Sequence, residues 1–370
     1  MKIFEIIPQL STGGAERFVV DLSNELSQQN EVFLITFWPI EGVHGFYASQ
    51  VSDRVKLISL NKKTGLDFSV FYNLYTLIKK HKPDIIHSHV DAILYTSVFQ
   101  FFCKGGFHTV HNQADKEAVG CLHRLIRKIA FKTGLIRAIT ISEESHNSFV
   151  SFYKTDACLI KNGRDIPCGL KVSHKVMTEF KRFKRTETTK VIVHLAHIDD
   201  VKRQLLMAKV ASRLFNEGFD FSVIFIGRAS DEKYYKELRD SIPSNCFILG
   251  ERKNPLEYLK EAGAYGLCSR YEGLPISLIE ALGVGAIPIC TPVGGIVNII
   301  KNGQNGFLSS DTTEDSYYVA LKSYLTSSEE ELRRISSNAL ESYKPYSMKE
   351  CAGHYLNLFK RTSYHTSDAY

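Results

Sequence analysis

The chain has 370 residues, 44% of them hydrophobic, and its 46 basic and 40 acidic residues give a formal net charge of +6. This length predicts about two domains, and 23 Phe, 18 Tyr and one Trp exclude a disordered chain. The charge is spread over 19 basic and 16 acidic residues up to residue 170 and 27 and 24 after it, which excludes the strongly basic surface typical of nucleic-acid-binding proteins.

The cysteines and the hydrophobic runs indicate the cellular compartment. The eight cysteines are scattered without C-x-x-C spacing, which favours reduced thiols over a zinc site or a disulfide framework. The N-terminal run contains Glu5 and Pro8 and is not typical of a secretion signal. No run approaches the ~18 apolar residues of a membrane-spanning helix. We therefore expect a soluble, cytoplasmic protein that at most lies peripherally on the inner face of the cell membrane.

Short apolar runs alternate with segments of helical period along the whole chain. The predicted strands are 2–7, 31–37, 55–60, 84–87, 108–111, 138–141, 158–161, 191–195, 222–226, 247–249, 265–268 and 287–290, with helices such as 16–29 and 69–80 between them. Continuous apolar strands that alternate with helices indicate parallel βαβ units. The sequence predicts an α/β protein with two Rossmann-like, doubly wound parallel-sheet domains, 1–165 and 188–346, that face each other across a cleft. A linker, 166–187, joins them, and an amphipathic helix over 347–362 is expected to pack back on the first domain.

The segment 269–295, SRYEGLPISLIEALGVGAIPICTPVGG, carries the strongest motif. Glu272 and Glu280 have seven residues between them and flank the point where a strand gives way to a helix. The start of a helix presents unpaired N–H groups and the positive end of its dipole, which suits a diphosphate. A structural alternative stays open, because Ser277 and Glu280 also fit the S-x-x-E capping box and Glu272 alone could be a solvated loop acid.

The string EGLPISLIE, followed by TPVGG and NGQNGFL, resembles the donor-binding motif of retaining glycosyltransferases of family 4, which have the GT-B fold. Further motifs occur in the order of that family: Gly13-Gly-Ala-Glu-Arg17, Asp84-Ile-Ile-His-Ser-His89, Val110-His-Asn112, Thr140-Ile-Ser-Glu143 and Lys161-Asn-Gly163. The resemblance covers nearly the whole chain and implies a bacterial enzyme of surface-polysaccharide synthesis, such as capsule or O-antigen.

The resemblance also implies roles for residues of the second domain. Glu272 would accept hydrogen bonds from the donor sugar as a catalytic residue, and Glu280 would bind the ribose. Lys202 and Arg203 would face the diphosphate, and His197 stands where the family usually has an arginine, so that phosphate binding would depend more on Lys202. The remaining expected donor-binding residues are Gly250 and Arg252 at the base, and Leu274, Ile276 and Ser277 through their backbone N–H groups.

In the first domain, Gly14 is expected to approach the sugar donor and Gly13 the acceptor side, since neither has a Cβ that would block a ligand. His111 matches the family's sugar-contacting histidine and is assigned as catalytic. His87 and His89 lie in one predicted strand, and we interpret their side chains as pointing to opposite faces, with His89 on the acceptor side. On that interpretation they cannot share a metal ion, and no metal and no cofactor besides the nucleotide sugar is expected.

The spacing of the two glutamates bears on the mechanism. Eight residues of helix span ~12 Å, whereas a double displacement needs carboxylates ~5 Å apart. A front-face substitution is therefore expected, in which the leaving diphosphate helps to deprotonate the acceptor and the enzyme stabilises its charge.

A basic segment indicates the acceptor. Residues 118–142 contain no acid and five cations, which are Arg124, Arg127, Lys128, Lys132 and Arg137, among apolar residues of helical spacing. Such a helix suits an anionic membrane surface, although an ordinary core helix with a cationic outer face has the same pattern.

The prediction is a transferase that moves a hexose-type sugar from a nucleoside diphosphate, UDP rather than GDP, to a lipid-linked or oligosaccharide acceptor. The alternatives are a GT-B sugar-nucleotide epimerase and a non-catalytic membrane-associated binding protein. An NAD-dependent oxidoreductase is excluded because Gly13-Gly14 lacks the third glycine of G-x-G-x-x-G.

Overall fold

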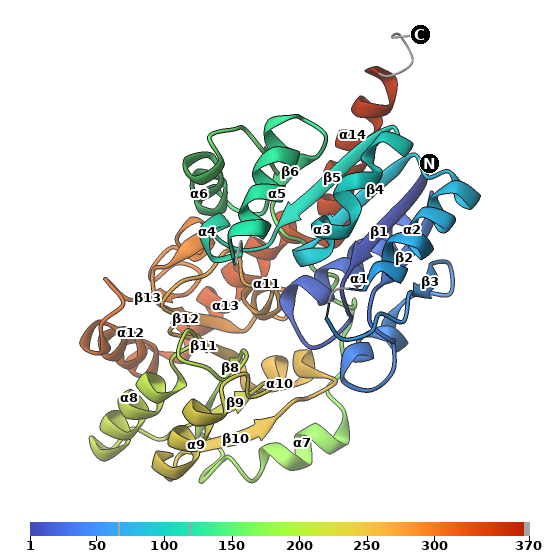
Figure 1. Cartoon of the computed structure of the whole chain (residues 1–370). Helices are drawn as coiled ribbons and strands as arrows, with labels where there is room; N and C mark the ends of the chain where they lie inside the picture. Colours follow the sequence, from blue (N-terminus) through green and yellow to red (C-terminus); the bar gives the residue numbers. More distant parts are fainter. Residues whose placement is uncertain (66, 118–119, 366–370) are drawn as a thin grey trace. The chain divides into compact units, whose positions relative to one another are not determined.

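The computed structural model describes residues 1–65, 67–117 and 120–365 (Figure 1). The chain divides into two compact units, one made of Met1–Asp165 with the segment that begins at Tyr346, the other of Ile166–Pro345. Each unit is built on one parallel β-sheet with helices packed on it.

The sheet of the first unit has the strand order β3-β2-β1-β4-β5-β6-β7. Its strands are β1 (Lys2–Ile7), β2 (Glu31–Thr36), β3 (Lys56–Ser59), β4 (Ile85–His89), β5 (Gly105–Val110), β6 (Arg137–Thr140) and β7 (Cys158–Leu159). Its α-helices are α1 (Gly14–Leu26), α2 (Phe68–His81), α3 (Ile93–Thr96), α4 (Ala114–Glu117), α5 (Cys121–Lys132), α6 (Glu143–Tyr153) and α14 (Met348–His365). Short 3₁₀ helices are η1 (Gly42–Gly45), η2 (Ala48–Gln50), η3 (Val90–Ala92), η4 (Ser97–Phe102) and η6 (Lys344–Tyr346), the last of which ends at the boundary between the units.

The sheet of the second unit has the order β10-β9-β8-β11-β12-β13. Its strands are β8 (Lys190–Leu195), β9 (Phe221–Ile226), β10 (Cys246–Gly250), β11 (Ala264–Leu267), β12 (Ile287–Cys290) and β13 (Phe307–Leu308). Its helices are α7 (His174–Phe180), α8 (Gln204–Asn216), α9 (Glu232–Ser241), α10 (Pro255–Ala262), α11 (Ile276–Gly283), η5 (Gly294–Asn298), α12 (Glu314–Thr326) and α13 (Glu329–Tyr343).

Both sheets reverse their direction of winding next to their first strand. In the first unit β1 lies between β2 and β4, and in the second β8 lies between β9 and β11. In doubly wound folds the loops at the carboxyl ends of these two central strands diverge to opposite faces of the sheet and leave room for a ligand. The fold therefore makes the loops after β1, β4, β8 and β11 the places to look for a site.

The sequence-based prediction of two Rossmann-like, doubly wound halves is confirmed, and each predicted strand overlaps an observed one. The strand β13 was missed, because a two-residue run carries no periodic signal. Residues 166–187, which we expected to be a linker, contain α7, whose Val176 and Phe180 are buried. Helix α14 packs against α1 and β5 of the first unit, and its Tyr355 and Phe359 are fully buried.

The structure also bears on membrane-spanning helices and on the cysteines. In the part that the structure describes, no helix has the length and hydrophobicity needed to cross a membrane. All eight cysteines lie within the described residues and are free thiols, and Cys246, Cys268, Cys290 and Cys351 are buried.

Candidate active site

Lys202 and Glu272, which lie 70 residues apart in the sequence, form an ion pair in the second unit. The Lys202 Nζ atom lies 2.6 Å from Glu272 Oε1, and the Ser269 hydroxyl donates to the same oxygen over 2.6 Å. Glu272 is 7% exposed, whereas the Lys202 side chain keeps 23% of its surface in solvent. A buried carboxylate with one partly exposed cation beside it is a polar site that a ligand can reach from the lysine side.

The pair arises because its two residues follow neighbouring strands. Lys202 lies in the loop after β8 and Glu272 in the loop after β11, the strands that flank the reversal of this sheet. The loops are fastened to each other, since the Arg270 N–H donates to the Val201 carbonyl over 2.8 Å and the Arg270 guanidinium pairs with Asp200 at 2.9 Å. These contacts fix where Lys202 and Glu272 meet.

The start of α11 is held by a contact that local sequence does not reveal. The Ser277 hydroxyl lies 2.8 Å from the hydroxyl of Tyr265 on β11. The N-cap of α11 is Pro275, and no side chain caps the helix. The capping-box interpretation of Ser277 and Glu280 is therefore wrong, because Ser277 lies inside the helix and turns toward the sheet. Glu280, in the same helix, is 6% exposed.

The backbone at this end of α11 has the features expected of an anion site. In the first turn of a helix the N–H groups lack intrahelical acceptors, so those of Ile276 and Ser277 remain available to a ligand. Leu274 and Ile276 bury their side chains, which leaves the backbone as the polar part of this loop. Pro275 has no N–H to donate.

A second loop closes against the Glu272 loop. The Gly295 N–H donates to the Gly273 carbonyl over 2.6 Å. Gly294 has φ of +58°, and a Cβ at this position would lie 2.2 Å from the Glu272 carbonyl oxygen. Only glycine fits this conformation and this approach, so the glycines of TPVGG shape the backbone that carries Glu272.

Arg203 and His197, which are also predicted to bind phosphate, form hydrogen bonds away from Glu272. The Arg203 guanidinium donates to the Thr312 carbonyl over 2.6 Å, which ties it to the loop after β13. The His197 carbonyl accepts from the Gln204 side chain over 2.7 Å, and the His197 residue is partly exposed after β8. Sequence reasoning missed His194, which is buried in β8, with its Nε2 3.3 Å from the Lys202 carbonyl. Burial lowers the pKa of His194 to about 4.

Gly250 and Arg252, expected at the nucleotide base, lie at the end of β10 and in the loop after it. Gly250 has φ of +67°, a conformation that favours glycine. The Arg252 guanidinium pairs with Glu179 of α7 at 3.2 Å and donates to the Tyr258 hydroxyl over 3.1 Å. The Arg252 side chain thus fastens α7 to this unit, and its backbone is the part left for a ligand.

In the first unit, the glycine loop lies after β1, at the start of α1. Gly13 is the N-cap of α1 in an extended conformation, and Gly14 is exposed. The Glu16 carboxylate lies over Gly13, where a Cβ would be 2.2 Å from Glu16 Oε2, and Ser11 donates to Glu16 Oε1 over 3.1 Å. The space above Gly13 that we assigned to an acceptor thus holds the Glu16 side chain.

The histidines of β4 meet a buried carboxylate. Glu5 Oε2 on β1 lies 2.9 Å from His87 Nδ1 and 2.8 Å from His89 Nε2, and all three side chains are fully buried. Our interpretation that His87 and His89 point to opposite faces is wrong, because residues two apart in a strand share a face. The two histidines can therefore share a metal ion as far as their geometry is concerned, because Glu5, His87 and His89 offer ligand atoms within 4.8 Å of one another.

This cluster continues in two directions through hydrogen-bonding groups. His89 Nδ1 lies 3.0 Å from Nε2 of His111, which directly follows β5. His87 Nε2 lies 2.8 Å from the Thr109 hydroxyl, which is 2.9 Å from the hydroxyl of Tyr355 on α14. The structure therefore joins the predicted residues His89 and His111 and adds Glu5, which the sequence prediction did not include among the site residues.

Burial controls the ionisation of this cluster. It lowers the pKa of His87, His89 and His111 to about 3 each and raises the pKa of Glu5, against the hydrogen bond from His89. The histidines are consequently neutral at physiological pH, with one nitrogen of each ring carrying a proton.

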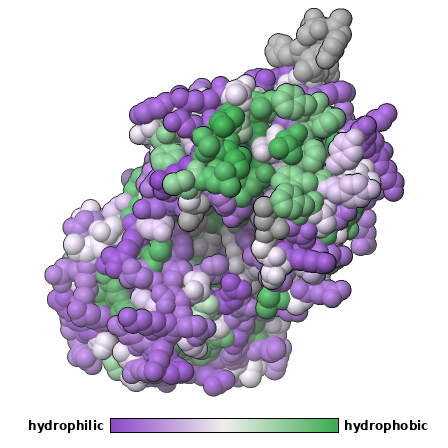
Figure 2. All heavy atoms as spheres, in the orientation of Figure 1, coloured by the Kyte–Doolittle hydropathy of each residue, from purple (hydrophilic) through white to green (hydrophobic). Residues whose placement is uncertain are grey.

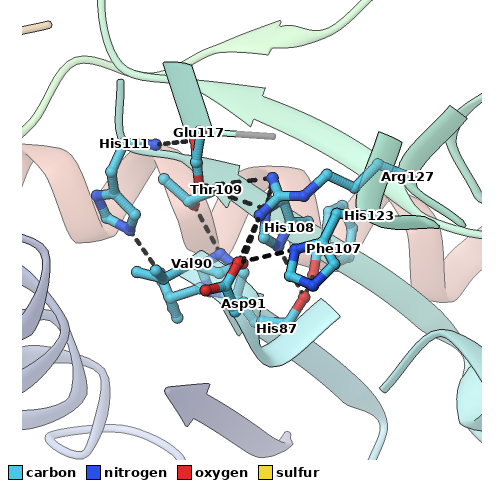
Figure 3. Close-up of polar contacts among 12 residues, drawn as sticks. His87, Val90, Asp91, Phe107, His108, Thr109, His111, Glu117, His123 and Arg127 are labelled. Atoms are coloured by element: carbon cyan, nitrogen blue, oxygen red, sulfur yellow. Dashed lines mark hydrogen bonds and ion pairs between the residues drawn. The ribbon is translucent and has the colours of Figure 1, made fainter. Parts of the chain in front are cut away.

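A second cluster fixes the backbone of His111 (Figure 3). Glu117 lies between His111 and Arg127: its Oε2 accepts from the His111 N–H over 3.1 Å, and its Oε1 is 3.5 Å from the guanidinium. Burial raises the pKa of Glu117 to about 6, although Arg127 opposes this shift. Arg127 also donates to the Val90 carbonyl over 2.9 Å, where Val90 has an unusual φ of +53° for a β-branched residue.

The expectation that Arg127 is one of the exposed cations of a membrane-binding helix is therefore wrong. It is 1% exposed, because the position that it occupies on α5 faces the core of the first unit. Arg124, Lys128 and Lys132 of α5 are exposed. Ala118 and Val119, at the start of the predicted basic segment, lie outside the described residues.

Comparison with known proteins agrees with this architecture. The model of Glycosyltransferase Family 4 matches residues 12–166, and that of Glycosyl transferases group 1 matches residues 176–342. The chain is 25% identical, over 97% of its length and 98% of the relative's, to an α-1,4-N-acetyl-D-galactosaminyltransferase of Campylobacter jejuni whose name specifies a PP-undecaprenol-linked saccharide. It is 23% identical, over 76% of its length and 74% of the relative's, to UDP-Gal:α-D-GlcNAc-diphosphoundecaprenol α-1,3-galactosyltransferase of Escherichia coli.

A solved structure resembles the whole fold. HepE of Anabaena, in complex with UDP and glucose, superimposes with a TM-score of 0.80 at 17% sequence identity. The superposition covers 97% of this chain and 99% of the HepE chain. Together, the two consecutive family models and the paired parallel sheets show that the chain belongs to the glycosyltransferases of family 4 and group 1, which have the GT-B fold.

Proposed function

We propose that this glycosyltransferase moves a hexose-type sugar, with retention of configuration, from a UDP-sugar to a lipid-linked saccharide in surface-polysaccharide biosynthesis. The observation that carries the proposal is the contact between Lys202 and Glu272, 2.6 Å apart at the reversal of the second sheet. The acceptor class is taken from the Campylobacter jejuni and Escherichia coli relatives, whose names specify undecaprenol-linked saccharides. The choice of UDP is supported by the name of the latter and by the UDP complex of HepE.

The two glutamates, Lys202 and the start of α11 each have a chemical role in this proposal. The Glu272 carboxylate accepts hydrogen bonds from hydroxyls of the transferred sugar, and Glu280 binds the ribose. Lys202 and the N–H groups at the start of α11 stabilise the negative charge that builds on the departing diphosphate. The diphosphate oxygen then takes the proton of the attacking acceptor hydroxyl as the new glycosidic bond forms on the same face of the sugar.

His111 is proposed to contact the transferred sugar, and Gly14 to let the backbone approach the sugar donor. Gly250 and Arg252 are proposed to meet the base through their backbone, and His197 and Arg203 to support the phosphates. No metal ion takes part in the proposed chemistry, because a lysine and backbone N–H groups supply the positive charge. Activity that survives EDTA is the expected result, and its loss, with recovery on adding Mg²⁺ or Mn²⁺, would contradict this part of the proposal.

Thermal stabilisation by a panel of nucleotide sugars tests the proposed donor class. A ligand at 100 times its Kd stabilises the folded state by about 2.7 kcal/mol, which the melting temperature reports. We expect UDP and one UDP-sugar to stabilise the wild type and the surface variant Glu314→Gln equally, and Glu272→Gln to respond less to the sugar. Stabilisation by GDP-sugars alone would refute the choice of UDP.

An apolar surface of the first unit supports contact with a membrane. Its exposed side chains, which we call the apolar face, belong to α5, η4 and α2: Leu122, Leu125, Ile129, Val98, Phe101, Phe102, Phe68 and Tyr72, each at least 50% exposed. Figure 2 shows apolar side chains gathered over α5 and α3. α5 adds the exposed cations Arg124, Lys128 and Lys132, and aromatic and aliphatic side chains beside fixed cations suit the interface of an anionic bilayer.

We therefore propose that the enzyme binds peripherally to an anionic membrane through the apolar face. Sedimentation with vesicles of phosphatidylglycerol and phosphatidylcholine tests this. The double variant Leu125→Ser/Ile129→Ser should bind several-fold less than the wild type, whereas Val319→Ser, which changes a 60% exposed residue of α12 in the other unit, should bind normally. Equal sedimentation of all three proteins would refute the role of this face.

The two alternatives predict different products. A sugar-nucleotide epimerase would release a sugar without an acceptor, and the names of the transferase relatives do not favour it. A non-catalytic binding protein would release no UDP from any donor.

A further inference from the structure

Glu5, buried in the centre of the first sheet, has no role in the function proposed above. It is the only acid of β1 and is fully buried. Among the described residues no fixed cation pairs with it, and the histidines of β4 that contact it are neutral. An unpaired buried carboxylate is costly, so an acid in this position needs an explanation beyond packing.

The geometry connects Glu5 to His111 through one intermediate side chain. Glu5 Oε2 lies 2.8 Å from His89 Nε2, and His89 Nδ1 lies 3.0 Å from His111 Nε2. Register explains the first contact, because Glu5 of β1 pairs with His87 of β4 and His89 follows two residues later on the same face. The ring of Phe18, edge-on to His111 with centroids 5.6 Å apart, confines the imidazole from another side.

We propose that Glu5 is a positioning residue that acts through His89 to fix which nitrogen of His111 carries the proton. In its ionised form Glu5 has only acceptors, so in that state His89 Nε2 donates to it. His89 Nδ1 is then unprotonated and must accept a hydrogen bond from His111 Nε2. His111 is left with a proton on Nε2 and a lone pair on Nδ1.

This arrangement decides what His111 can recognise. A ring that offers only a lone pair at Nδ1 binds a hydrogen-bond donor, such as a sugar hydroxyl or the N–H of an acetamido group, and not a phosphate oxygen. This step rests on the proposed role of His111 as a sugar contact. The backbone of His111 is fixed independently, since its N–H donates to Glu117 over 3.1 Å, so the two clusters hold both the main chain and the ring.

The other branch of the cluster offers a matched control. Tyr355 is fully buried and its hydroxyl lies 2.9 Å from Thr109, which contacts His87 and not His89 or His111. Tyr355→Phe removes one buried hydroxyl from the same cluster without altering the path from Glu5 to His111.

The test combines ¹⁵N spectra of the histidine rings with kinetics on the full chain. In the wild type we expect one tautomer of His111, with Nε2 protonated. Glu5→Leu removes the acceptor without adding a polar group, and Glu5→Gln, a second variant in case the first does not fold, offers His89 both an oxygen and an N–H. Either change should shift the His111 signals toward the other tautomer and lower kcat/KM about tenfold, the factor for one hydrogen bond of about 1.4 kcal/mol. Tyr355→Phe should change neither.

Three results would overturn or separate the claims. Unchanged His111 signals in a folded Glu5 variant would overturn the positioning role. One equivalent of a transition metal in the purified wild type, absent from Glu5→Leu, would also overturn it and identify Glu5, His87 and His89 as metal ligands. If the tautomer responds as expected but His111→Ala transfers sugar normally, the positioning role stands and the proposed sugar contact fails.

Discussion

Replacing Lys202 by Met should affect stability and turnover in different ways. The substitution leaves the Glu272 carboxylate, 7% exposed, with the Ser269 hydroxyl but without its cation. Exposed ion pairs contribute up to about 1 kcal/mol, and breaking a buried pair costs about 3–5 kcal/mol. Because the Lys202 side chain is 23% exposed, we expect an intermediate loss of about 2 kcal/mol, which lowers the melting temperature by about 4–8 °C for a unit of this size.

The loss of turnover should be larger than the loss of stability. If Lys202 stabilises charge on the departing diphosphate, its removal should lower kcat by a factor of about 10²–10³, as for other groups that stabilise a developing charge. The assay is UDP release under steady-state conditions at a temperature well below the melting of the variant. Turnover within threefold of the wild type in a folded Lys202→Met protein would show that Lys202 does not stabilise the departing diphosphate.

Two further variants test whether the effects of Lys202→Met come from the Lys202–Glu272 pair or from the loss of any positive charge. Lys209→Met breaks a pair of the same unit, with Glu314 at 2.8 Å, whose lysine is 71% exposed, and should change the melting temperature by less than about 2 °C. The double variant Lys202→Met/Glu272→Gln removes the buried charge together with its partner. It should recover part of the lost stability but none of the activity.

Three further predictions concern the supports of the site. His194 should contribute to acid sensitivity: its pKa is about 4 in the folded protein and about 6.5 when unfolded, so the unfolded state binds the extra proton and stability falls as the pH drops from 6.5 toward 4. Between pH 6.5 and pH 5 the free energy of unfolding falls by about 2 kcal/mol through this group. His194→Asn should therefore flatten the pH dependence of the free energy of urea unfolding, and an unchanged pH dependence would contradict the role of His194. Gly294→Ala should cost more activity than Gly303→Ala in the UDP-release assay, since both have positive φ but only at Gly294 does a Cβ meet backbone, at 2.2 Å; equal losses would be contrary to this. Arg127→Met should destabilise by about 3–5 kcal/mol, and Arg124→Met, at an exposed position, by less than about 0.5 kcal/mol, as measured by calorimetry; similar melting temperatures would show that Arg127 is not needed.

The fold could be predicted from the sequence because its signals are local and repeated. Runs such as Val191–Leu195 and Ser222–Ile226 are continuous and apolar, since parallel strands are buried on both faces, and they lie inside the observed β8 and β9. Phe307–Leu308 was missed because two residues form a strand only in the presence of β12.

The site could be predicted only in part, because its contacts connect distant residues. The motif placed Glu272 and Lys202 in adjacent loops of one fold, but their 2.6 Å contact depends on the Arg270 contacts that fasten those loops. The S-x-x-E pattern suggested a cap, yet Ser277 instead contacts Tyr265, 12 residues before it. A local pattern cannot reveal such competition for a hydroxyl.

Burial of polar residues was the least predictable feature. Arg127 fits the charged side of an amphipathic helix by spacing, but a facing Glu117 and the Val90 carbonyl make its burial favourable. Glu5 lies in an apolar strand, and only the pairing of β1 with β4 shows that it meets two histidines.

Acceptor-dependent UDP release distinguishes sugar transfer by this protein from every alternative considered above. The wild type and Glu272→Gln are incubated with a panel of UDP-sugars, with and without an undecaprenyl-diphosphate-linked saccharide, and UDP and the mass of the lipid-linked product are measured together. We expect that one UDP-sugar yields UDP only when the acceptor is present, that the product gains the mass of one sugar residue, and that Glu272→Gln forms neither. UDP release at the same rate without an acceptor, or full activity of Glu272→Gln, would contradict the proposed sugar transfer.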